Sequence, residues 1–459
     1  MKKKLLDLLV FLVLAFILFG ITAVISRVLV LVHLKSVADS FVFSTLIRLF
    51  RVGIILFFLV GITYKWLWSR EKLQNTSGKV IFSSLLFFLF LFITSLYYLL
   101  VDFAPQYYSA VKQFYNTETF IEGEPYQADA QLGFSFKPSN RVYRVSKKTG
   151  EKDTILRTDE NSCRVAFDFK PSDYSRRPLV MFLGCSFTYG HGIDNPENTF
   201  AHKSSTALGG YPVNFAVAGY GLSQMLMRTQ TMVPRLKPDV VVVQYSPWLV
   251  DRATAYYIPN EPLKLTTSYF TADNGSISFC KPAFETRQYS STMLKYRLTP
   301  ASTTNYIAFL FEVAAPAFYH DVFARIGLTI KEWLHLTPKP AKDKKAVEKY
   351  VYDQIYETCR QNGAKMAVLN LGNPVYTKDS HRLLSDKGDV IFVEADSVLW
   401  SRVSDSLSYD RAYCFWRSNG TDSVVSDRHP SYNAHSVIAE TVVAALKPML
   451  TPADSLNSK

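Results

Sequence analysis

The sequence predicts an α/β protein, built as a three-layer α/β/α sandwich around a doubly wound parallel sheet and preceded by an α-helical transmembrane region. Two observations predict it. After residue 178, continuous apolar runs alternate with amphipathic helical stretches, which is typical of a parallel sheet covered by helices on both faces. Before residue 103, uncharged stretches are long enough to cross a lipid bilayer.

Residues 1–103 are predicted to be a membrane region with three transmembrane helices. Residues 8–26 form a stretch of 19 residues without a charge, and residues 80–101 form one of 22, close to the roughly 20 residues that a spanning helix needs. The middle segment, residues 52–64, has only 13 uncharged residues and reaches spanning length by extending backwards. An interfacial or re-entrant helix at 41–66 is the alternative.

Basic residues flank these segments and predict their orientation. Three lysines stand at residues 2–4, and residues 65–79 carry four basic residues against one acidic residue, so both belong in the cytoplasm by the positive-inside rule. Three crossings then place everything after Asp102 on the extracytoplasmic side of a bacterial inner or plasma membrane. Two crossings would leave it in the cytoplasm, whereas a cleaved signal peptide at 8–26 would again leave it outside.

The composition of the 459 residues excludes several classes of protein. With 48% hydrophobic and 20% charged residues, the chain is not disordered. Residues 1–103 hold 11 Lys and Arg against 4 Asp and Glu, so most of the net charge of +12 flanks membrane segments and no nucleic-acid partner is expected. The five cysteines are Cys163, Cys185, Cys280, Cys359 and Cys414. Their spacing predicts neither a zinc site nor a disulfide scaffold, and one or two disulfide bridges are the alternative.

Two different stretches follow the membrane region. Residues 104–129 are aromatic and polar and are predicted to be a stalk or docking helix that leads off the membrane. Residues 130–177 contain short alternating stretches, such as 140–145 and 165–169, with Pro and Gly between them. This alternation predicts a small β-rich lead-in to the main domain.

The predicted domain at 130–450 contains five parallel strands and at least four helices, and a tail follows at 451–459. The strands are continuous apolar runs, at residues 179–183, 213–217, 240–244, 365–371 and 390–395. The helices have apolar residues at helical spacing, at residues 198–208, 222–235, 343–361 and 434–446. Residues 253–342 interrupt the alternation and are predicted to be an insertion or lid.

The end of the first strand carries a candidate nucleophile. Residues 183–192 read LGCSFTYGHG, so Ser186 stands in a glycine-flanked turn between a strand and a helix. Such a turn exposes the hydroxyl and leaves the backbone N–H of the serine free to stabilise an oxyanion. The second strand ends in NFAVAGYG, where Gly219 lets a backbone N–H approach the same oxyanion. Open parallel sheets bind ligands at the carboxyl ends of their strands, so both residues are expected at one edge.

A candidate general base stands near the C-terminus, where residues 426–430 read SDRHP. His429 can take the proton of the Ser186 hydroxyl, and Asp427, two residues earlier, can orient the imidazole ring. The sequence therefore predicts a Ser-His-Asp triad.

These blocks resemble the SGNH (GDSL-like) hydrolase family. LGCSFTYGHG resembles its first block, NFAVAGYG its second and DRHPSYNAHSVIAE its last, and the similarity covers residues 130–447. The resemblance implies a flavodoxin-like sheet and an ester hydrolase or O-acyltransferase that needs neither a metal nor an organic cofactor. It implies that Ser186 is the nucleophile, His429 the general base and Asp427 its partner. The backbone N–H groups of Ser186 and Gly219 would then form part of the oxyanion hole.

The sequence departs from the family at three positions. Cys185 replaces the Asp before the serine, and Ala434 replaces a Gly in the last block. Trp248 stands where the third block supplies an Asn side chain to the oxyanion hole, and Arg252 is the predicted substitute donor. Loss of one such donor lowers the rate by about 10²–10³. A slow enzyme or a non-catalytic relative is therefore the alternative.

Other residues of these blocks have alternative interpretations. Asp396, at the end of the fifth strand, is an alternative orienting acid, and Cys185 is an alternative nucleophile. His191 and His435 are expected to have structural roles. The aromatic residues at 256–284 are expected to form the core of the lid, with stacking on sugar rings as the alternative.

Three crossings ahead of such a domain resemble cell-envelope enzymes that modify polysaccharides with O-acyl groups. The resemblance predicts a membrane-anchored serine esterase or O-acyltransferase that acts on acyl esters, in particular acetyl esters, of cell-envelope polysaccharide. Its expected partners are the lipid bilayer, the acylated polysaccharide and an integral-membrane O-acyltransferase. The alternatives are a non-catalytic scaffold that binds glycan or an assembly partner, and a cytoplasmic lipid esterase behind two crossings.

Overall fold

The computed structural model describes residues 93–94, 97, 99–100, 104, 118–258, 266–273, 275–283, 303–418 and 423–450. The chain divides into two compact units, residues 1–110 with 309–318 and residues 111–308 with 319–459. The three predicted membrane helices lie almost entirely outside the described residues, as does the predicted tail. The parallel sheet and the candidate site belong to the second unit.

The second unit is built on a five-stranded sheet in which all neighbouring strands are parallel, in the order β12-β11-β8-β6-β7. The strands are β6 (Leu179–Leu183), β7 (Tyr211–Asn214), β8 (Val240–Tyr245), β11 (Lys365–Asn370) and β12 (Ile391–Val393). Of these five strands, β6 comes first in the chain and lies between the second, β7, and the third, β8, which is the doubly wound order of flavodoxin-like sheets. The predicted parallel α/β sheet is confirmed, and the carboxyl end of β6 lies where such sheets bind ligands.

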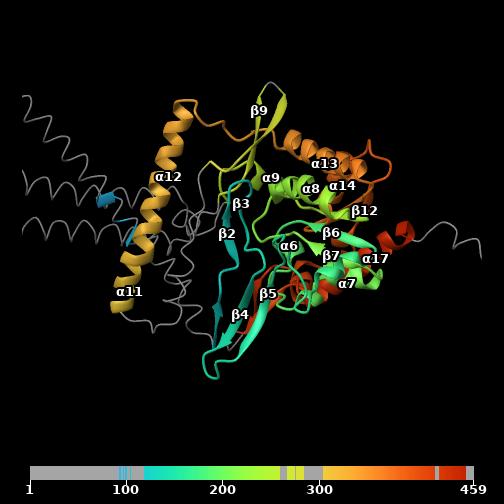
Figure 1. The fold of residues 1–459 in the computed structure, drawn as a ribbon, viewed down its shortest axis with the longest axis horizontal. Coiled ribbons are helices and arrows are strands. Elements are labelled where there is room, and N and C mark those ends of the chain that lie inside the picture. The colour runs from blue at the N-terminus through green and yellow to red at the C-terminus, as the bar shows by residue number, and fades with distance from the viewer. Residues whose placement is uncertain are drawn as a thin grey trace, which may run out of the picture. The chain divides into compact units, whose positions relative to one another are not determined.

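Two layers of helices cover the sheet (Figure 1). They are α8 (Leu222–Leu236) and α13 (Lys344–Gln361) on one face, and α7 (Phe200–Ala207) and α17 (Tyr432–Leu450) on the other. Alternate residues of β6 show the division, since Leu179 and Met181 pack with the first pair and Val180 and Phe182 with the second. Burial of both faces explains why these strands are continuous apolar runs. The four predicted helices are confirmed, with small shifts at their ends.

Two predicted strands differ from the structure. The strand predicted at 213–217 is β7, which ends at Asn214 because the Asn214 side chain accepts the Ala216 N–H and turns the chain. Residues 165–169 form no strand. Next to them, Arg164 makes only isolated β-bridges, with Thr158 and Asn214. The apolar residues at 165–169 are therefore buried without pairing as a strand.

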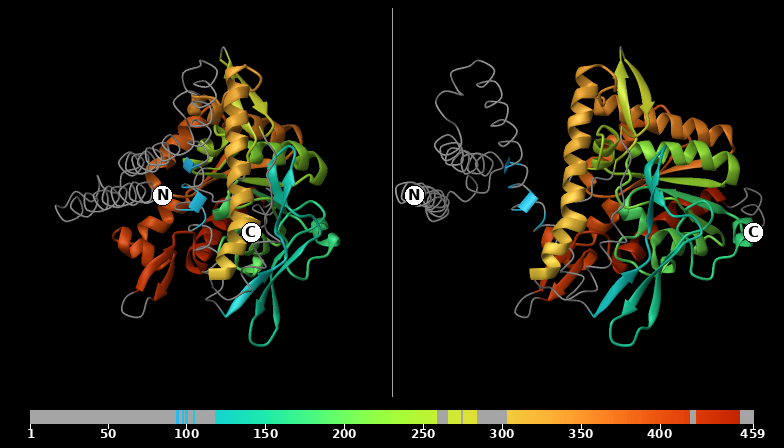
Figure 2. Two further views of the ribbon diagram at one scale, coloured as in Figure 1. Left: turned by 90° about the vertical axis from the view of Figure 1, so that its left-hand side faces the viewer. Right: turned by 60° about the vertical axis from the view of Figure 1, so that its left-hand side comes forward.

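The β-rich lead-in is larger than predicted. Its strands are β1 (Thr119–Glu122), β2 (Tyr126–Asp129), β3 (Gly133–Phe136), β4 (Arg141–Ser146) and β5 (Lys152–Arg157). All pair antiparallel, β1 with β4, β4 with β5 and β2 with β3, and Figure 2 shows β4 and β5 as a long ribbon. The predicted stalk at 104–129 is therefore wrong for residues 119–129, whose pairing partners lie further along the chain. Residues 105–117 of it lie outside the described part.

The predicted insertion contains a hairpin and a long helix. β9 (Tyr269–Asp273) pairs antiparallel with β10 (Ser276–Cys280). Further along, α11 (Thr303–Phe309), a π-helical turn and α12 (Ala315–Trp333) follow one another. Among the described residues, Thr304–Trp333 is the helix that is long and apolar enough to cross a membrane. A core helix of a soluble protein meets the same criterion, so the multi-pass topology predicted for residues 1–103 stays a prediction.

The remaining elements lie at the loops of the sheet. They are α6 (Ser186–Tyr189), α9 (Trp248–Ala253), α14 (Thr377–Leu383), α15 (Ala395–Ser401), α16 (Ser406–Tyr413), β13 (Phe415–Ser418), β14 (Ser423–Asp427) and three short 3-10 helices, Pro171–Ser175, Pro196–Asn198 and Pro374–Tyr376. β13 and β14 pair antiparallel. This hairpin ends at Asp427, so the predicted acid, Asp427, and the predicted base, His429, lie together directly after it.

Candidate active site

Ser186 lies in a tight turn at the carboxyl end of β6. It is the first residue of α6, and the N–H of Gly190 donates to the Ser186 carbonyl at 3.1 Å. Gly190 ends the turn with a φ of 83°, in the left-handed region that favours glycine. Ser186 is 7% exposed, so the turn holds its hydroxyl in a largely desolvated position.

Gln244, near the end of β8, fixes this turn from the sheet. Its Oε1 accepts the Cys185 N–H at 3.1 Å and the Thr188 hydroxyl at 2.7 Å. A Cβ on Gly184 would lie 2.4 Å from Thr188 Oγ1 and 2.5 Å from Gln244 Oε1, so close packing requires glycine there. Gln244 was not among the predicted site residues. A polar residue that ends the apolar run VVVVQ was the feature that could have found it.

Asp427 and His429 form a hydrogen-bonded pair after β14. Asp427 Oδ1 lies 2.5 Å from His429 Nδ1 and accepts the His429 backbone N–H at 3.0 Å. Burial acts to raise the pKa of Asp427, but the hydrogen bonds from His429 outweigh it and hold that pKa below its ordinary value. The carboxylate is therefore ionised at neutral pH and holds Nδ1, which leaves Nε2 of His429 as the nitrogen that can take a proton.

The structure brings His429 to the turn that carries Ser186. The His429 ring centroid lies 5.3 Å from that of Phe187 and 4.4 Å from that of His191, whose backbone N–H donates to the Ser186 carbonyl at 2.9 Å. The Ser186 hydroxyl faces Cys185 Sγ at 3.9 Å, and within the described part of the chain no hydrogen bond joins it to His429. The predicted nucleophile and base are thus neighbours that are not hydrogen bonded.

His191 is a second imidazole beside the same carboxylate. Its Nε2 lies 3.5 Å from Asp427 Oδ2, and burial together with the neighbouring His429 lowers the pKa of His191. The ligand atoms of His191, Asp427 and His429 lie within 4.8 Å of one another, and zinc accepts two imidazoles with one carboxylate. These three groups could therefore hold a divalent cation. His429 Nδ1 would first have to leave Asp427 Oδ1, since ligands of one tetrahedral zinc ion lie about 3.3 Å apart.

Gly219, the predicted second oxyanion donor, has a φ of 92°, which favours glycine. A Cβ there would lie 2.7 Å from Ile258 Cδ1. The next residue is held on both sides, because the Tyr220 hydroxyl donates to Phe134 O at 3.1 Å and Arg252 Nη1 donates to Tyr220 O at 2.9 Å. The loop after β7 is therefore fixed, and Arg252, predicted as a third donor, contacts this loop.

Trp248, at the position of the usual Asn, begins α9. Its ring centroid lies 5.2 Å from that of Phe187, and a Cβ on Gly372 would lie 3.2 Å from the indole. The indole thus packs between the residue after Ser186 and the loop after β11. A third oxyanion donor, from Trp248 or from Arg252, stays a prediction.

Arg164, which the sequence analysis did not single out, braces the loop after Ser186. Its guanidinium donates to the carbonyls of Tyr189 at 2.6 Å and Gly190 at 3.3 Å, and to those of Ile193 at 2.5 Å and Asp194 at 2.9 Å. Arg164 is 3% exposed. It ends the stretch TDENSCR, residues 158–164, in which no site residue was predicted.

The alternative site residues take other positions. Cys185 is fully buried, and Gln244 Nε2 donates to its Sγ at 3.3 Å. Asp396 is buried on α15, where it accepts the Ser397 N–H at 2.7 Å. His435 is buried in α17, where its Nδ1 accepts the Phe200 N–H at 2.9 Å and caps α7. Each of these contacts is structural, as was expected for His435.

A cavity of about 290 Å³ is lined by residues next in the chain to the predicted triad. Its lining is aromatic and polar: Phe187, Trp248, Gly372, Trp400, Ser406, Tyr409, Asp410, Cys414 and Arg428. Phe187 follows Ser186 in the chain, and Arg428 lies between Asp427 and His429. The cavity is therefore a candidate for binding part of a substrate.

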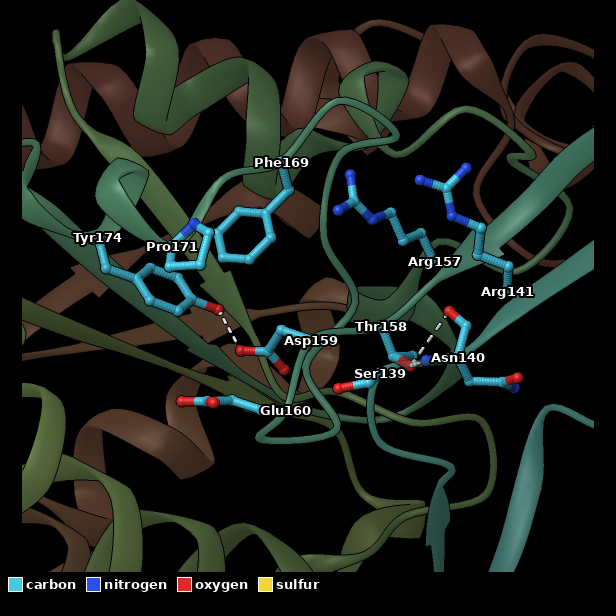
Figure 3. A pocket seen from close by; sticks show the side chains of 10 residues that line it. All are labelled: Ser139, Asn140, Arg141, Arg157, Thr158, Asp159, Glu160, Phe169, Pro171 and Tyr174. Carbon is cyan, nitrogen blue, oxygen red and sulfur yellow. Dashed lines mark hydrogen bonds between the residues drawn. The ribbon is translucent and has the colours of Figure 1, made fainter.

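A second cavity lies in the lead-in and is lined by no residue of the predicted triad. Figure 3 shows two guanidinium groups on one side of it, from Arg141 and Arg157, and the Tyr174 hydroxyl bonded to Asp159 on the other. Asp159 also accepts the Cys163 N–H at 2.7 Å. This bond shapes the turn that places Arg164, so the wall of the cavity also supports the active site.

Comparison with known proteins gives no match to a family model and none to a curated protein. Solved structures resemble the chain at low identity. TesA has 13% identity, with 59% of this chain and 99% of TesA covered and a TM-score of 0.31. A lipolytic protein of the G-D-S-L family from Desulfitobacterium hafniense has 11% identity, with 59% and 100% covered and a TM-score of 0.31.

A catalytic mutant of Axe2, an acetylxylan esterase from Geobacillus stearothermophilus, has 12% identity to the chain. The match covers 59% of this chain and 94% of Axe2, with a TM-score of 0.31. At these TM-scores the likenesses assign neither a family nor an activity to the chain.

Proposed function

We propose that the protein is an acyl-ester hydrolase or O-acyltransferase that works through Ser186, His429 and Asp427. The observation that carries the proposal is the Asp427–His429 pair, 2.5 Å between Oδ1 and Nδ1, with the imidazole against the ring of Phe187 next to Ser186. Two segments that are distant in the chain, residues 186–191 and 427–429, meet there. An oriented imidazole beside a serine in a strand-to-helix turn is the arrangement that acyl transfer requires.

The reaction proceeds by two transfers through an acyl-enzyme. Ser186 first turns its hydroxyl from Cys185 Sγ towards His429 Nε2. Its Oγ then bonds to the acyl carbon while Nε2 takes the proton, and the backbone N–H groups of Ser186 and Gly219 stabilise the oxyanion. The alcohol leaves with the proton from His429. Water or a sugar hydroxyl then attacks the acyl-enzyme and gives its proton to His429. The bond between the acyl carbon and Ser186 Oγ breaks, and His429 passes the proton to Oγ, so the free acid or the new ester leaves and the hydroxyl of Ser186 is restored.

The proposed substrate is an acyl ester, in particular an acetyl ester, of cell-envelope polysaccharide, and the proposed enzyme is anchored in the membrane. The charge pattern and length of the segments in residues 1–103 support the anchor. The motif order that resembles SGNH hydrolases supports the substrate class. An integral-membrane O-acyltransferase is the proposed partner.

A non-catalytic scaffold of the same fold is the second candidate. It is favoured by Trp248 in place of the usual Asn and by the lack of a hydrogen bond between the described Ser186 and His429 side chains. Such a scaffold would bind a glycan or an assembly partner without turnover.

Purified full-length protein in detergent, assayed with p-nitrophenyl acetate, tests the proposal. The wild type is expected to release p-nitrophenol, Ser186→Ala is expected to lose this activity, and the exposed control Ser172→Ala is expected to keep it. A wild type that is as inert as Ser186→Ala, on this ester and on acetylated polysaccharide, would establish the scaffold instead.

A further inference from the structure

The aromatic cavity is one ring away from the catalytic histidine. Phe187 lies between them, with its centroid 5.3 Å from that of His429 and 5.2 Å from that of Trp248. On the other side, Arg428 adjoins His429 in the chain and lines the same cavity. A molecule in the cavity therefore lies within one ring width of the atoms that carry out acyl transfer.

The walls of the cavity offer flat apolar surfaces. Trp400 and Tyr409 stack on each other, with centroids 4.5 Å apart and planes at 20°. Trp248 meets Phe187 edge to face, at 62°. Such rings contact the C–H face of a sugar ring over a large area and lose little conformational freedom on binding.

The cavity also carries polar groups that an apolar ligand cannot use. The Arg428 guanidinium lies 3.1 Å from Asp410 Oδ2 at its rim, and Ser406 adds a hydroxyl. The indole Nε1 of Trp400 is buried and has no hydrogen-bond partner in the described part of the chain. An unpaired buried N–H is costly, so a ligand hydroxyl that reached Nε1 would stabilise the complex.

We infer that this cavity binds one sugar ring of the substrate, the alcohol part of the ester and not its acyl part. The inference rests on the proposed function. The volume of about 290 Å³ is at the lower end of the roughly 300–1,000 Å³ that small-molecule sites occupy, so it suits a single ring. The aromatic walls can contact the C–H groups of a sugar, and the charged pair and the free donors can bond to its hydroxyls. An acyl chain would leave these donors unpaired.

Two esters with the same acyl group test the inference on full-length protein in detergent. Vinyl acetate has no ring in its alcohol part, and methyl 6-O-acetylglucopyranoside has one. Trp400→Leu is expected to lower the ratio of kcat/KM for the sugar ester to that for vinyl acetate by at least tenfold, through KM. Trp400→Phe, which keeps a ring and loses the N–H, is expected to give an intermediate ratio. Trp333→Leu, exposed on α12, is the matched control and is expected to keep the wild-type ratio.

A ratio in Trp400→Leu equal to that of the wild type would overturn the inference. A change in the preference for vinyl butyrate over vinyl acetate in Trp400→Leu, with the sugar ratio unchanged, would assign the cavity to the acyl chain and overturn it as well.

Binding separates failure of the inference from failure of the proposed function. Titration calorimetry of Ser186→Ala with methyl 6-O-acetylglucopyranoside is expected to give heat that the added Trp400→Leu substitution removes. If the wild type hydrolyses no ester, this result still supports a sugar site. Absent binding, or binding that is equal with and without Trp400, would overturn the site even if hydrolysis occurs.

Discussion

Asp427 serves two imidazoles, and each uses a different oxygen of its carboxylate. Oδ1 lies 2.5 Å from His429 Nδ1, and Oδ2 lies 3.5 Å from His191 Nε2. The ionised carboxylate fixes which nitrogen of His429 carries the proton. In the proposed reaction it would also stabilise the imidazolium that forms when Ser186 is deprotonated.

Asp427→Asn should therefore lower kcat for p-nitrophenyl acetate by roughly 10³–10⁴-fold with little change in KM, because an amide does not hold the required tautomer. Initial rates of the full-length protein in detergent measure this decrease in kcat, and Asp353→Asn on α13 is the control. Activity within tenfold of the wild type would transfer the orienting role to another acid, such as Asp396.

Zinc should inhibit the enzyme through the three groups that could hold a cation. His191→Gln removes one of the three ligands and should weaken the inhibition by zinc by about tenfold or more. EDTA alone should leave the rate unchanged, since the proposed triad uses no metal. An equal inhibition constant in wild type and His191→Gln would remove His191 from the zinc site.

At the scale of elements, the lead-in holds the loop that follows Ser186. Arg164 donates to four carbonyls of residues 189–194, and Arg144 of β4 pairs with the Asp194 carboxylate through two hydrogen bonds, at 2.5 Å and 3.0 Å. The two arginines replace the regular structure that this loop lacks. The position of the short helix α6 therefore depends on residues that precede the sheet.

Arg164→Met should lower both stability and kcat. It removes the hydrogen bonds of four backbone carbonyls, which corresponds to about 2–4 kcal/mol. Thermal unfolding of the full-length chain measures the stability, and the acetate assay measures the rate. Arg235→Met, an exposed arginine, is the control. An unchanged kcat in Arg164→Met would show that the loop keeps its position without the guanidinium.

The contact between α17 and α7 should make stability depend on pH. Burial lowers the pKa of His435 to about 3, because its neutral Nδ1 accepts the Phe200 N–H and its other side is enclosed. Between about pH 3 and 6.5 the unfolded chain binds a proton at this residue and the folded chain does not. Stability is therefore complete above about pH 6.5 and falls as the pH is lowered, by up to about 1.4 kcal/mol per pH unit.

The variant His435→Gln isolates this effect from other titrating groups. It should lose stability at pH 7, and it should lose less than the wild type when the pH falls from 6.5 to 5. Thermal midpoints of both chains at the two pH values measure the difference. Parallel losses in the two chains would contradict the lowered pKa.

At the scale of the whole molecule, the sequence predicted the parallel sheet well because burial of both faces leaves continuous apolar runs. The strands β6, β8 and β11 were found nearly to their ends. β1 and β2 were missed because they are short strands whose partners lie later in the chain. Pairing over such distances leaves no local pattern.

The residues that surround the candidate site were predicted only in part, because some of their contacts have no local pattern in the sequence. Ser186 and the Asp427–His429 pair stand out locally, by a glycine-flanked turn and by close spacing. Arg164 acts on a loop about 25 residues away, and its role depends on a guanidinium that reaches four carbonyls in space. No spacing of residues in the sequence predicts these contacts.

The orientation in the membrane is a further prediction at this scale. A fusion of alkaline phosphatase after Asp102 should be active, because three crossings carry that point out of the cytoplasm, where the fused enzyme folds with its disulfides. Fusion to a cytoplasmic reporter at the same point is the control and should be inactive. The opposite pattern would support two crossings and the cytoplasmic alternative.

The bonds between Arg164 and the loop at 189–194 also constrain how the protein can change over evolution. A chain that begins at Pro178 would retain every strand of the parallel sheet and the three residues of the proposed triad, yet it would lack the guanidinium that holds the loop after Ser186. Insertion of a single residue in the loop would need a compensating change more than twenty positions earlier. The lead-in and the domain built on the parallel sheet can therefore be exchanged between relatives only together.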